Sequence, residues 1–497
     1  MQERSSGAEL AASLRRELER YSPGEKLPSS RALVERHRVS PVTVSRALAQ
    51  LAAEGLVVTR PGAGAFRAAP HAEAPRPVDT SWQEIALSAE PAGDQVPRSV
   101  DATGVLATLA APAPGVIEFD GGYLHSDLQP ERALSAALAR AGRRPGAWSR
   151  PPVGGVPELR AWFAREIAGS GGPLGANDVL ITGGGQSALT AALRALAAPG
   201  APVLVESPTY PGVLAVARAS GLRPVPVPLD ADGVRTDLLA EAFRASGARL
   251  FVCQPLFQNP TGAVLAAERR REVLRVARAA GAFVIEDDFA RLLSHADGPP
   301  LPPTLMAEDR DGTVVHVRSL TKASSPNLRV GALAARGPVL DRLRAIQVVD
   351  SFFVPRPLQE AALELVGSPA WPRHLRLIAG ELTARRDALT AALHRQLPAF
   401  TAHRPVPGHD PAPGGPYVPP GGFHLWLRLP EGIDEAALTG AALRAGVAVA
   451  AGRPYFAAEP PGACLRLSFA AASGTGEIAE GVRRLRTACT ELGVEVD

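Results

Sequence analysis

Short apolar runs alternate with alanine-rich stretches of helical periodicity along most of this 497-residue chain. Runs of this length, bounded by turn residues and separated by helices, are typical of strands in a parallel sheet that is buried on both faces. The sequence therefore predicts an α/β fold with a mostly parallel central sheet. The clearest of these runs are Val179–Thr182, Pro202–Val205, Leu250–Cys253, Phe283–Ile285 and Val314–Val317.

Composition limits where in the cell a protein with this sequence is expected. No apolar run is long enough to span a membrane, and residues 1–20 are charged and lack the apolar centre of a signal peptide. The three cysteines, Cys253, Cys464 and Cys489, are scattered without a pairing pattern. We expect a soluble cytoplasmic protein of two to four domains, with no metal site.

The basic excess is concentrated at the N-terminus. Residues 1–69 contain 11 Lys and Arg against 7 Glu, whereas the whole chain has a net charge of only +3. This distribution is expected if the N-terminal segment binds a polyanion. A solvated basic helix face has the same composition, so charge alone does not decide between them.

Three short helices are predicted in this segment. Apolar residues recur at helical spacing in the first helix, which Pro23-Gly24 ends. Ser29 or Ser30 can cap a second helix, Arg31–His37, and Ser40-Pro41 begins a third. Two helices joined by a tight turn, with hydroxyl and arginine residues near the start of the second, match the helix-turn-helix plan.

A two-stranded wing is predicted after the third helix. Leu56–Arg60 and Ala65–Phe66-Arg67 are strand-like, and the glycines between them let the backbone approach a phosphate. The run from Pro23 to Gly64 resembles the winged-helix domain of the GntR family. That resemblance implies DNA contacts at Arg31, Ser40, Thr43, Arg46, Gly62 and Gly64.

One departure from this family concerns the operator. Pro41 stands where many members have arginine, so a usual DNA contact is missing and the operator sequence stays open. The alternative is a small helical domain for protein interaction.

The domain boundaries follow from composition. Residues 1–69 form the predicted winged helix, and the Pro-, Ala- and Gly-rich residues 70–114 form a linker with a short ordered piece near Trp82–Leu87. The predicted body spans 115–497, with a large part at about 155–355 and a small part at about 370–497 that includes some of 115–154.

Polar residues follow several of the predicted strands. In an open α/β sheet this carboxyl edge is where ligands bind. A glycine turn at Gly183-Gly184-Gly185 precedes a helix, Ser187–Leu196, and favours an anion. Three further groups follow other strands: the loop with Tyr210, the run Asn259-Pro260-Thr261-Gly262, and the acids Glu286-Asp287-Asp288. Each of these groups, taken alone, has an ordinary structural explanation.

Lysine occurs only at Lys26 and Lys322 among 53 basic residues. Arginine stays protonated and cannot form an imine, whereas a lysine with a lowered pKa can. Lys322 follows Ser319, and Arg329 lies seven residues further on, so an aldehyde and its phosphate can be held together. A leftover surface lysine is the alternative explanation.

With these motifs in this order, the body resembles the fold-type-I pyridoxal-phosphate (PLP) proteins of the class I/II aminotransferase family. The resemblance implies a smaller α+β subdomain at the C-terminus and a Schiff base between Lys322 and PLP. It implies that Asp287 pairs with the ring nitrogen, Tyr210 stacks on the ring and Asn259 bonds the 3-oxygen. It places the phosphate at Gly185, Gln186, Ser319 and Arg329, and a substrate or effector carboxylate at Arg466.

Three points stay open in this assignment. Phe289 replaces a tyrosine whose hydroxyl bonds the 3-oxygen in many members, which is expected to weaken turnover. Either Asp287 or Asp288 can face the ring. Arg466 can instead form a structural ion pair.

A GntR-type winged helix joined to such a body is similar to the MocR family of transcriptional regulators. That resemblance implies a homodimer which binds double-stranded DNA and senses PLP or its adduct with an amino acid or amine. It also implies a cofactor site near the subunit interface and a winged helix docked on the partner. The alternatives are an active aminotransferase that carries a DNA-binding domain, and a cofactor-binding scaffold without DNA function.

Overall fold

The computed structural model describes residues 3–60, 62–68, 83, 100–110, 113–169, 172, 174–402 and 418–494. It divides into two compact units, Met1–Glu90 and Pro91–Asp497. Most of the ordered piece predicted near Trp82–Leu87 lies outside the described residues. Within the described residues, no helix is long and apolar enough to cross a membrane.

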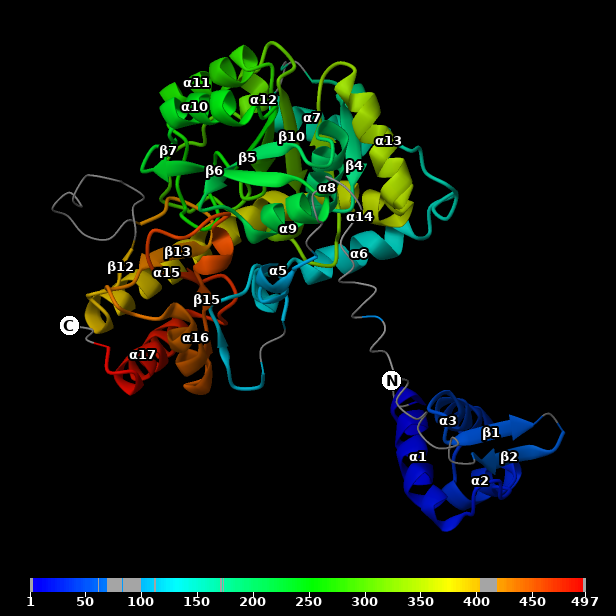
Figure 1. The fold of residues 1–497 in the computed structure, drawn as a ribbon. Helices are drawn as coiled ribbons and strands as arrows, with labels where there is room; N and C mark the ends of the chain where they lie inside the picture. Colours follow the sequence, from blue (N-terminus) through cyan, green and yellow to red (C-terminus); the bar gives the residue numbers. More distant parts are fainter. Residues whose placement is uncertain are drawn as a thin grey trace. The chain divides into compact units, whose positions relative to one another are not determined.

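The N-terminal unit is a small helical cluster with an antiparallel hairpin (Figure 1). Apolar side chains of all three helices form its core, among them Leu14, Leu33 and Leu48. Ser29, not Ser30, caps the second helix, because its side chain accepts a hydrogen bond from the Ala32 amide. The elements are α1 (Glu3–Glu17), η1 (Leu18–Arg20), α2 (Ser30–His37), α3 (Pro41–Ala53), β1 (Val57–Arg60) and β2 (Gly64–Arg67).

An eight-stranded sheet of order β4-β11-β10-β9-β8-β5-β6-β7 forms the centre of the second unit. The strand pairs from β10 through β9, β8 and β5 to β6 are parallel, whereas β11 and β7 run antiparallel to their neighbours. The predicted α/β class with a mostly parallel sheet is confirmed. The strands are β4 (Val179–Thr182), β5 (Pro202–Ser207), β6 (Arg223–Asp230), β7 (Gly233–Val234), β8 (Leu250–Cys253), β9 (Phe283–Asp288), β10 (Val314–Ser319) and β11 (Gly331–Ala334).

Helices cover both faces of this sheet and enclose two apolar cores (Figure 1). One core lies beneath α8 (Gly185–Leu196), α9 (Pro211–Ala219) and α13 (Val339–Ser351). The other lies beneath α7 (Pro157–Ala168), α10 (Thr236–Ser246), α11 (Ala267–Ala279), α12 (Leu305–Glu308) and α14 (Arg356–Val366). Burial on both faces is the reason the strands are apolar runs without polar alternation.

Strand β9 and helix α8 are longer than the sequence predicts. The acids Glu286-Asp287-Asp288 were expected on a loop after the strand, but β9 continues to Asp288 and all three side chains are buried. Because side chains alternate across a strand, these consecutive acids point to opposite faces of the sheet. The helix expected from Ser187 begins two residues earlier, at Gly185.

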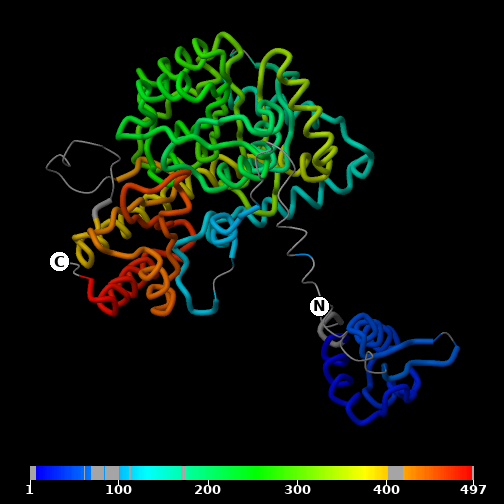
Figure 2. The backbone as a smooth tube through the Cα atoms, viewed as in Figure 1, coloured from blue at the N-terminus to red at the C-terminus, as the bar shows by residue number. Residues whose placement is uncertain are grey.

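The C-terminal part, orange to red in Figure 2, has its own four-stranded sheet of order β12-β13-β16-β15. The cyan stretch β3 (Ile117–Glu118) pairs with β14 (Val447–Ala448), so residues just after the linker join this part (Figure 2). The remaining elements are α5 (Thr103–Leu106), η2 (Ser126–Leu128), α6 (Glu131–Ala141), η3 (Ala176–Asp178), η4 (Thr321–Ala323), α15 (Ala370–Gln396), β12 (Thr401–Ala402), β13 (His424–Arg428), α16 (Glu435–Arg444), β15 (Ala450–Ala451), η5 (Arg453–Tyr455), β16 (Cys464–Ser468) and α17 (Thr475–Glu491).

Candidate functional site

A pocket of about 750 Å³ opens at the carboxyl edge of the large sheet, where the C-terminal part adjoins it. The structure brings all the body residues predicted for the site to its wall: Gly185, Gln186, Tyr210, Asn259, Asp287, Ser319, Lys322, Arg329 and Arg466. They come from six separate loops and strand ends, which only the sheet topology unites.

Lys322 lies on η4, directly after β10, with its side chain partly buried. Its Nζ donates to the Gly122 carbonyl at 2.6 Å and lies 3.9 Å from the centroid of the Tyr123 ring. Burial, followed by the positive charge of Arg466, lowers the pKa of Lys322 to about 7. A neutral amine is therefore available near neutral pH, which is the condition for attack on a carbonyl carbon. Lys322 is therefore not a leftover surface lysine.

Asp287 faces the pocket and Asp288 does not. Gln254 Nε2 donates to Asp287 Oδ2 at 2.7 Å. Burial raises the pKa of Asp287 to about 7, although the Gln254 hydrogen bond and the charge of Lys322 act in the opposite direction. A buried carboxylate that lacks a cationic partner is well suited to a protonated ring nitrogen, which would supply that charge.

Asp288 points to the other face of the sheet, where arginines hold it. Its Oδ2 accepts hydrogen bonds from Arg291 Nε at 2.5 Å and Arg318 Nη2 at 2.7 Å. Burial alone would raise the pKa of Asp288, but the charges of Arg318 and Arg291 hold it at about 2. The same strand thus carries a pocket acid and a structural acid one residue apart.

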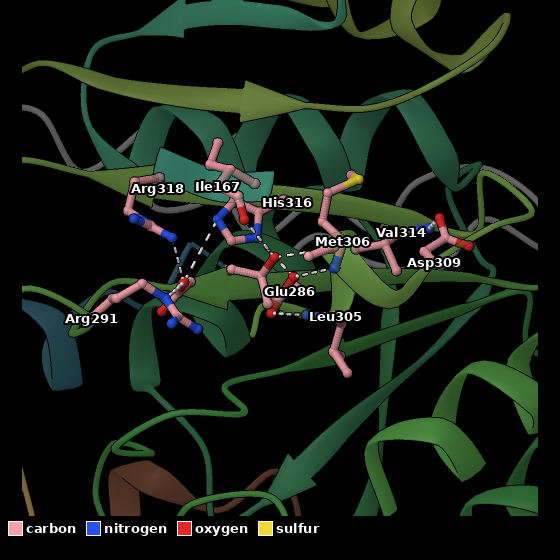
Figure 3. Close-up of polar contacts among 12 residues, drawn as sticks. Ile167, Glu286, Arg291, Leu305, Met306, Asp309, Val314, His316 and Arg318 are labelled. Carbon is pink, nitrogen blue, oxygen red and sulfur yellow. Dashed lines mark hydrogen bonds and ion pairs between the residues drawn. The ribbon is translucent and has the colours of Figure 1, made fainter. Parts of the chain in front are cut away.

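Glu286 and His316 complete this structural network (Figure 3). His316 Nδ1 lies 2.8 Å from Glu286 Oε2, and the Leu305 and Met306 amides donate to the same carboxylate. Glu286, Asp288 and His316 have their ligand atoms within 4.8 Å of one another, as in many metal sites. The two guanidinium groups on Asp288 already supply positive charge there, which disfavours a divalent cation.

The glycine turn before α8 lies at the pocket. Gly184 precedes the helix without a side-chain cap and has φ +90°, and Arg329 Nη2 donates to the Gly183 carbonyl at 2.7 Å. A Cβ on Gly184 would come within 2.9 Å of Arg329 Nη2, so glycine is what lets the guanidinium approach. The amides of the α8 N-terminus, Ser319 and Arg329 together suit a phosphate.

Tyr210 and Asn259 also line the pocket. Tyr210 Oη donates to Gln186 Oε1 at 3.3 Å, and burial raises the pKa of Tyr210. Among the described residues, Asn259 Oδ1 and Thr321 Oγ1 are buried without a hydrogen-bond partner. Buried polar atoms are rarely left without a partner, so these two atoms point to a polar ligand in the pocket.

Arg466, on β16, is held from two sides. Its Nη1 lies 3.2 Å from His424 Nε2, while Nη2 donates to the carbonyls of Asp120 and Gly121. Burial and the charges of Arg466 and Lys322 hold the pKa of His424 well below its usual range, so the ring is neutral. No carboxylate lies within ion-pair distance of Arg466 in the described part of the chain, so its charge is available to a ligand.

The residues predicted to contact DNA lie in the N-terminal unit, and they differ from one another in exposure. Ser40 Oγ accepts from the Thr43 amide at 3.2 Å and lies 2.9 Å from Thr43 Oγ1, so both side chains fix the first turn of α3. Thr43 is buried, whereas Val42, Ser45 and Arg46 are exposed on this helix.

The other residues predicted to contact DNA, Arg31, Gly62 and Gly64, are exposed. The Arg31 side chain is 91% exposed and lies only 3.6 Å from Glu35, a loose pair that a phosphate can replace. Gly62 and Gly64 have φ of +74° and +106°, which glycine alone adopts readily. They form the exposed tip of the β1–β2 hairpin.

Sequence reasoning missed several pocket residues. Gln254 directly follows a predicted strand, so its position at the carboxyl edge was a usable signal. His424, Phe423, Tyr123 and Leu109 reach the pocket from parts of the chain that are distant from the cofactor motifs. Nothing in their local sequence indicates a ligand.

The fold and the pocket define a two-part protein, a winged helix joined to a fold-type-I aminotransferase-like body. Residues 119–485 match "Aminotransferase class I and II" and residues 7–66 match "Bacterial regulatory proteins, gntR family". The chain belongs to the class I and II aminotransferase family and carries a GntR-type domain, which confirms the predicted MocR-type architecture.

Its relatives are of two kinds. The HTH-type transcriptional regulator TauR of Rhodobacter capsulatus is 28% identical, with 94% of this chain and 93% of TauR covered. The 2-aminoadipate transaminase of Thermus thermophilus is 31% identical over 76% of this chain and 91% of its own length. The crystal structure of LysN, the α-aminoadipate aminotransferase of the same species, complexed with N-(5'-phosphopyridoxyl)-L-leucine, superposes with a TM-score of 0.70 at 30% identity, covering 79% of this chain and 96% of LysN.

Proposed function

We propose that this chain is a DNA-binding transcriptional regulator of the MocR type that holds PLP in its aminotransferase-like body. The observation that carries this proposal is the union, in one chain, of an exposed GntR-type helix and wing with a pocket that holds Lys322 beside Asp287, Arg329 and Arg466. Relatives that span nearly the whole chain, such as TauR, are named HTH-type transcriptional regulators.

The pocket residues fit PLP. A phosphate matches the α8 N-terminus and Arg329, which the glycine at position 184 admits. A protonated ring nitrogen would supply the positive charge that Asp287 lacks, and a 3-oxygen would approach the partnerless Asn259 side chain. When bound, PLP supplies an aldehyde and an electron-withdrawing ring.

The residues of this chain prepare the site for that group. Lys322 presents an amine whose pKa is lowered to about 7, so a substantial share of it is neutral near that pH, and the Gly122 carbonyl orients it. Asp287, aligned by Gln254, keeps the ring nitrogen protonated. Phe289 lines the pocket without the hydroxyl that would bond the 3-oxygen, so Asn259 alone serves that oxygen among the residues assigned to it.

The DNA side of the proposal rests on α3 and the wing. Val42, Ser45 and Arg46 are exposed along α3, and Arg31 and the Gly62–Gly64 turn are free to approach phosphates. We expect a homodimer that binds two operator half-sites, with PLP or its adduct with an amino acid or amine favouring one arrangement of the dimer.

A second candidate function is an active aminotransferase that carries a DNA-binding domain. Lys322, Asp287 and Arg466 are all in place for it, and one relative is a transaminase. Phe289 and the fused winged helix count against it.

Two measurements test the proposal. The purified full chain with added PLP is expected to show a visible absorbance band, and borohydride reduction is expected to fix PLP to Lys322, as mass spectrometry of peptides would show. DNA from upstream of its own gene is expected to shift in a gel at moderate salt. Absence of the covalent product or of the shift would overturn the corresponding half of the proposal, and steady turnover with an amino donor and an oxo acid would favour the enzyme.

A further inference from the structure

One wall of the pocket comes from the last part of the predicted linker, residues 70–114. Residues 101–110, here called the strap, contain the short helix α5, and the amides of Leu109 and Ala110 continue its turn by donating to the Leu106 carbonyl. Thr108 and Leu109, at the end of the strap, line the pocket. The strap is therefore both a part of the candidate ligand site and a described segment of the predicted linker.

The strap rests on two prolines that lie close to pocket residues. Gly104 lies against Pro211 and Pro454, so closely that an added Cβ would come within 3.3 Å of the first and 2.9 Å of the second. Pro211 follows Tyr210 in the chain, and Pro454 precedes Tyr455, whose ring lies 5.5 Å from the Arg466 guanidinium carbon. The strap thus contacts both the large part and the C-terminal part next to pocket residues.

The charges of the pocket define what can bind beside PLP. Of the lining residues that the structure describes, the fully charged types are Asp287, Lys322, Arg329 and Arg466. Under the proposed function the ring nitrogen, the aldehyde carbon and the phosphate use the first three. Arg466 is left for one carboxylate, and a second ionised group would enter without a partner, which is costly in a partly buried site.

The spacing of Lys322 and Arg466 fits a small amino acid. Lys322 bonds the carbonyl of Gly122, while Arg466 bonds those of Asp120 and Gly121, so one short stretch of backbone holds both cations. Successive Cα atoms are only about 3.8 Å apart. The positions for an amine and for a carboxylate therefore lie within the reach of one small molecule.

Several residues that line the pocket are apolar or aromatic. Among them are Leu109, Tyr123 and Phe423, and the Thr108 hydroxyl is already engaged with the Val105 carbonyl at 2.8 Å. Leu109 is 55% exposed although it lines the pocket, so a ligand can still remove much of its apolar surface from water.

We propose that the effector is an amino acid with a single carboxylate and an uncharged, apolar side chain, and that this side chain packs against Leu109 of the strap. This inference rests on the proposed function, since the amine of the effector is received at PLP. Because the strap is the C-terminal part of the predicted linker, an effector that orders the strap restricts the tether of the winged helix.

The test uses the full PLP-loaded chain, titrated with L-leucine, L-glutamate and L-lysine while the cofactor absorbance is followed. L-Leucine is expected to bind at least about tenfold more tightly than either charged amino acid. Leu109→Ala is expected to reduce the L-leucine affinity by roughly fivefold to tenfold. Leu106→Ala is the matched control, because Leu106 is a 61% exposed leucine of the strap that does not line the pocket.

A second measurement follows the strap itself. L-Leucine is expected to slow hydrogen exchange of residues 101–110 in the PLP-loaded wild type and to have less effect in Leu109→Ala. Equal or tighter binding of L-glutamate or L-lysine, no absorbance change with any probe, or equal losses in the Leu106 and Leu109 variants would overturn the inference. A chain that never acquires the PLP band would instead overturn the proposed function.

Discussion

The two units use polar residues in opposite ways. In the N-terminal unit, Arg31 and Arg46 are exposed on a helical surface, ready to meet a large polyanion. In the body, Asp287, Asn259 and Arg466 are buried around a pocket, and each lacks part of its hydrogen bonding or charge balance. An exposed charge costs the fold little, whereas a buried one is kept at a cost that only a ligand offsets.

This contrast predicts how DNA binding and ligand binding each respond to the loss of one residue. A surface arginine acts through long-range charge, so its removal weakens binding gradually and in a salt-dependent way. A buried pocket residue acts through a single geometry, so its removal abolishes a specific step. The following changes test that difference, beginning with the largest expected effect.

Replacement of Lys322 by alanine is expected to abolish covalent capture of PLP completely. The only other lysine is Lys26, in the winged-helix unit, so Lys26→Ala is an exact control for lysine content. Borohydride reduction and intact mass are expected to show added PLP in Lys26→Ala and none in Lys322→Ala. A covalent product in the Lys322 variant would refute the assignment.

Asp287 and Asp288 are expected to differ in role: Asp288 stabilises the fold, and Asp287 serves PLP binding. Asp288→Asn leaves the buried Arg318 without its partner charge, so the free energy of unfolding is expected to fall by about 3–5 kcal/mol. Asp287→Asn is expected to raise that free energy at neutral pH or leave it no lower, because burial raises the pKa of Asp287 and ionisation of this acid therefore costs the folded state stability.

Urea unfolding measures the first effect, and PLP absorbance measures the second. The Asp287 variant is expected to remain folded but to bind PLP weakly or with an altered band. If both variants lost stability equally, the assignment of one pocket acid and one structural acid on β9 would be wrong.

The rate of PLP capture is expected to rise with pH through about 7, because the neutral form of Lys322 is the nucleophile and its pKa is about 7. Arg466 lowers this pKa through its charge, as Arg329 does more weakly, whereas Asp287 raises it. In Arg466→Gln the half-rise of the rate is therefore expected to move to higher pH. Stopped-flow absorbance across pH 5–9 checks this, and an unchanged half-rise would contradict the electrostatic cause.

Arg31→Ala is expected to have the smallest effect, a severalfold weaker affinity for all DNA sequences. Loss of one phosphate contact reduces the slope of log affinity against log salt by about 1. Arg16→Ala is a suitable control, because Arg16 is also exposed but lies on α1, outside the residues predicted to contact DNA. A change in sequence preference, rather than in the salt slope, would show that Arg31 reads bases.

Much of the body could be predicted because its signals are local. The strand Leu250–Cys253 has the predicted bounds, as does β4, since an apolar run between turns is favoured as a buried strand wherever it lies. The choice between Asp287 and Asp288 was not predictable, because it depends on how far β9 extends and which side of the sheet holds Arg318.

The distant members of the pocket were beyond local reasoning for a similar reason. Leu109 and His424 are separated by more than 300 residues of sequence and meet only because the strap and β13 both adjoin the carboxyl edge of the sheet. Their local sequences resemble any linker end and any core strand.

The sequence alone determined which chemical groups this protein possesses: one body lysine, a glycine turn before a helix, acids after a strand and a basic winged helix. These depend on residue type and short spacing, which the chain carries directly. Only the tertiary structure decided which groups share a pocket, which of two adjacent acids faces it, and that the end of the linker forms one of its walls. Burial and electrostatic environment depend on contacts between distant segments, and these exist only once the sheet has assembled.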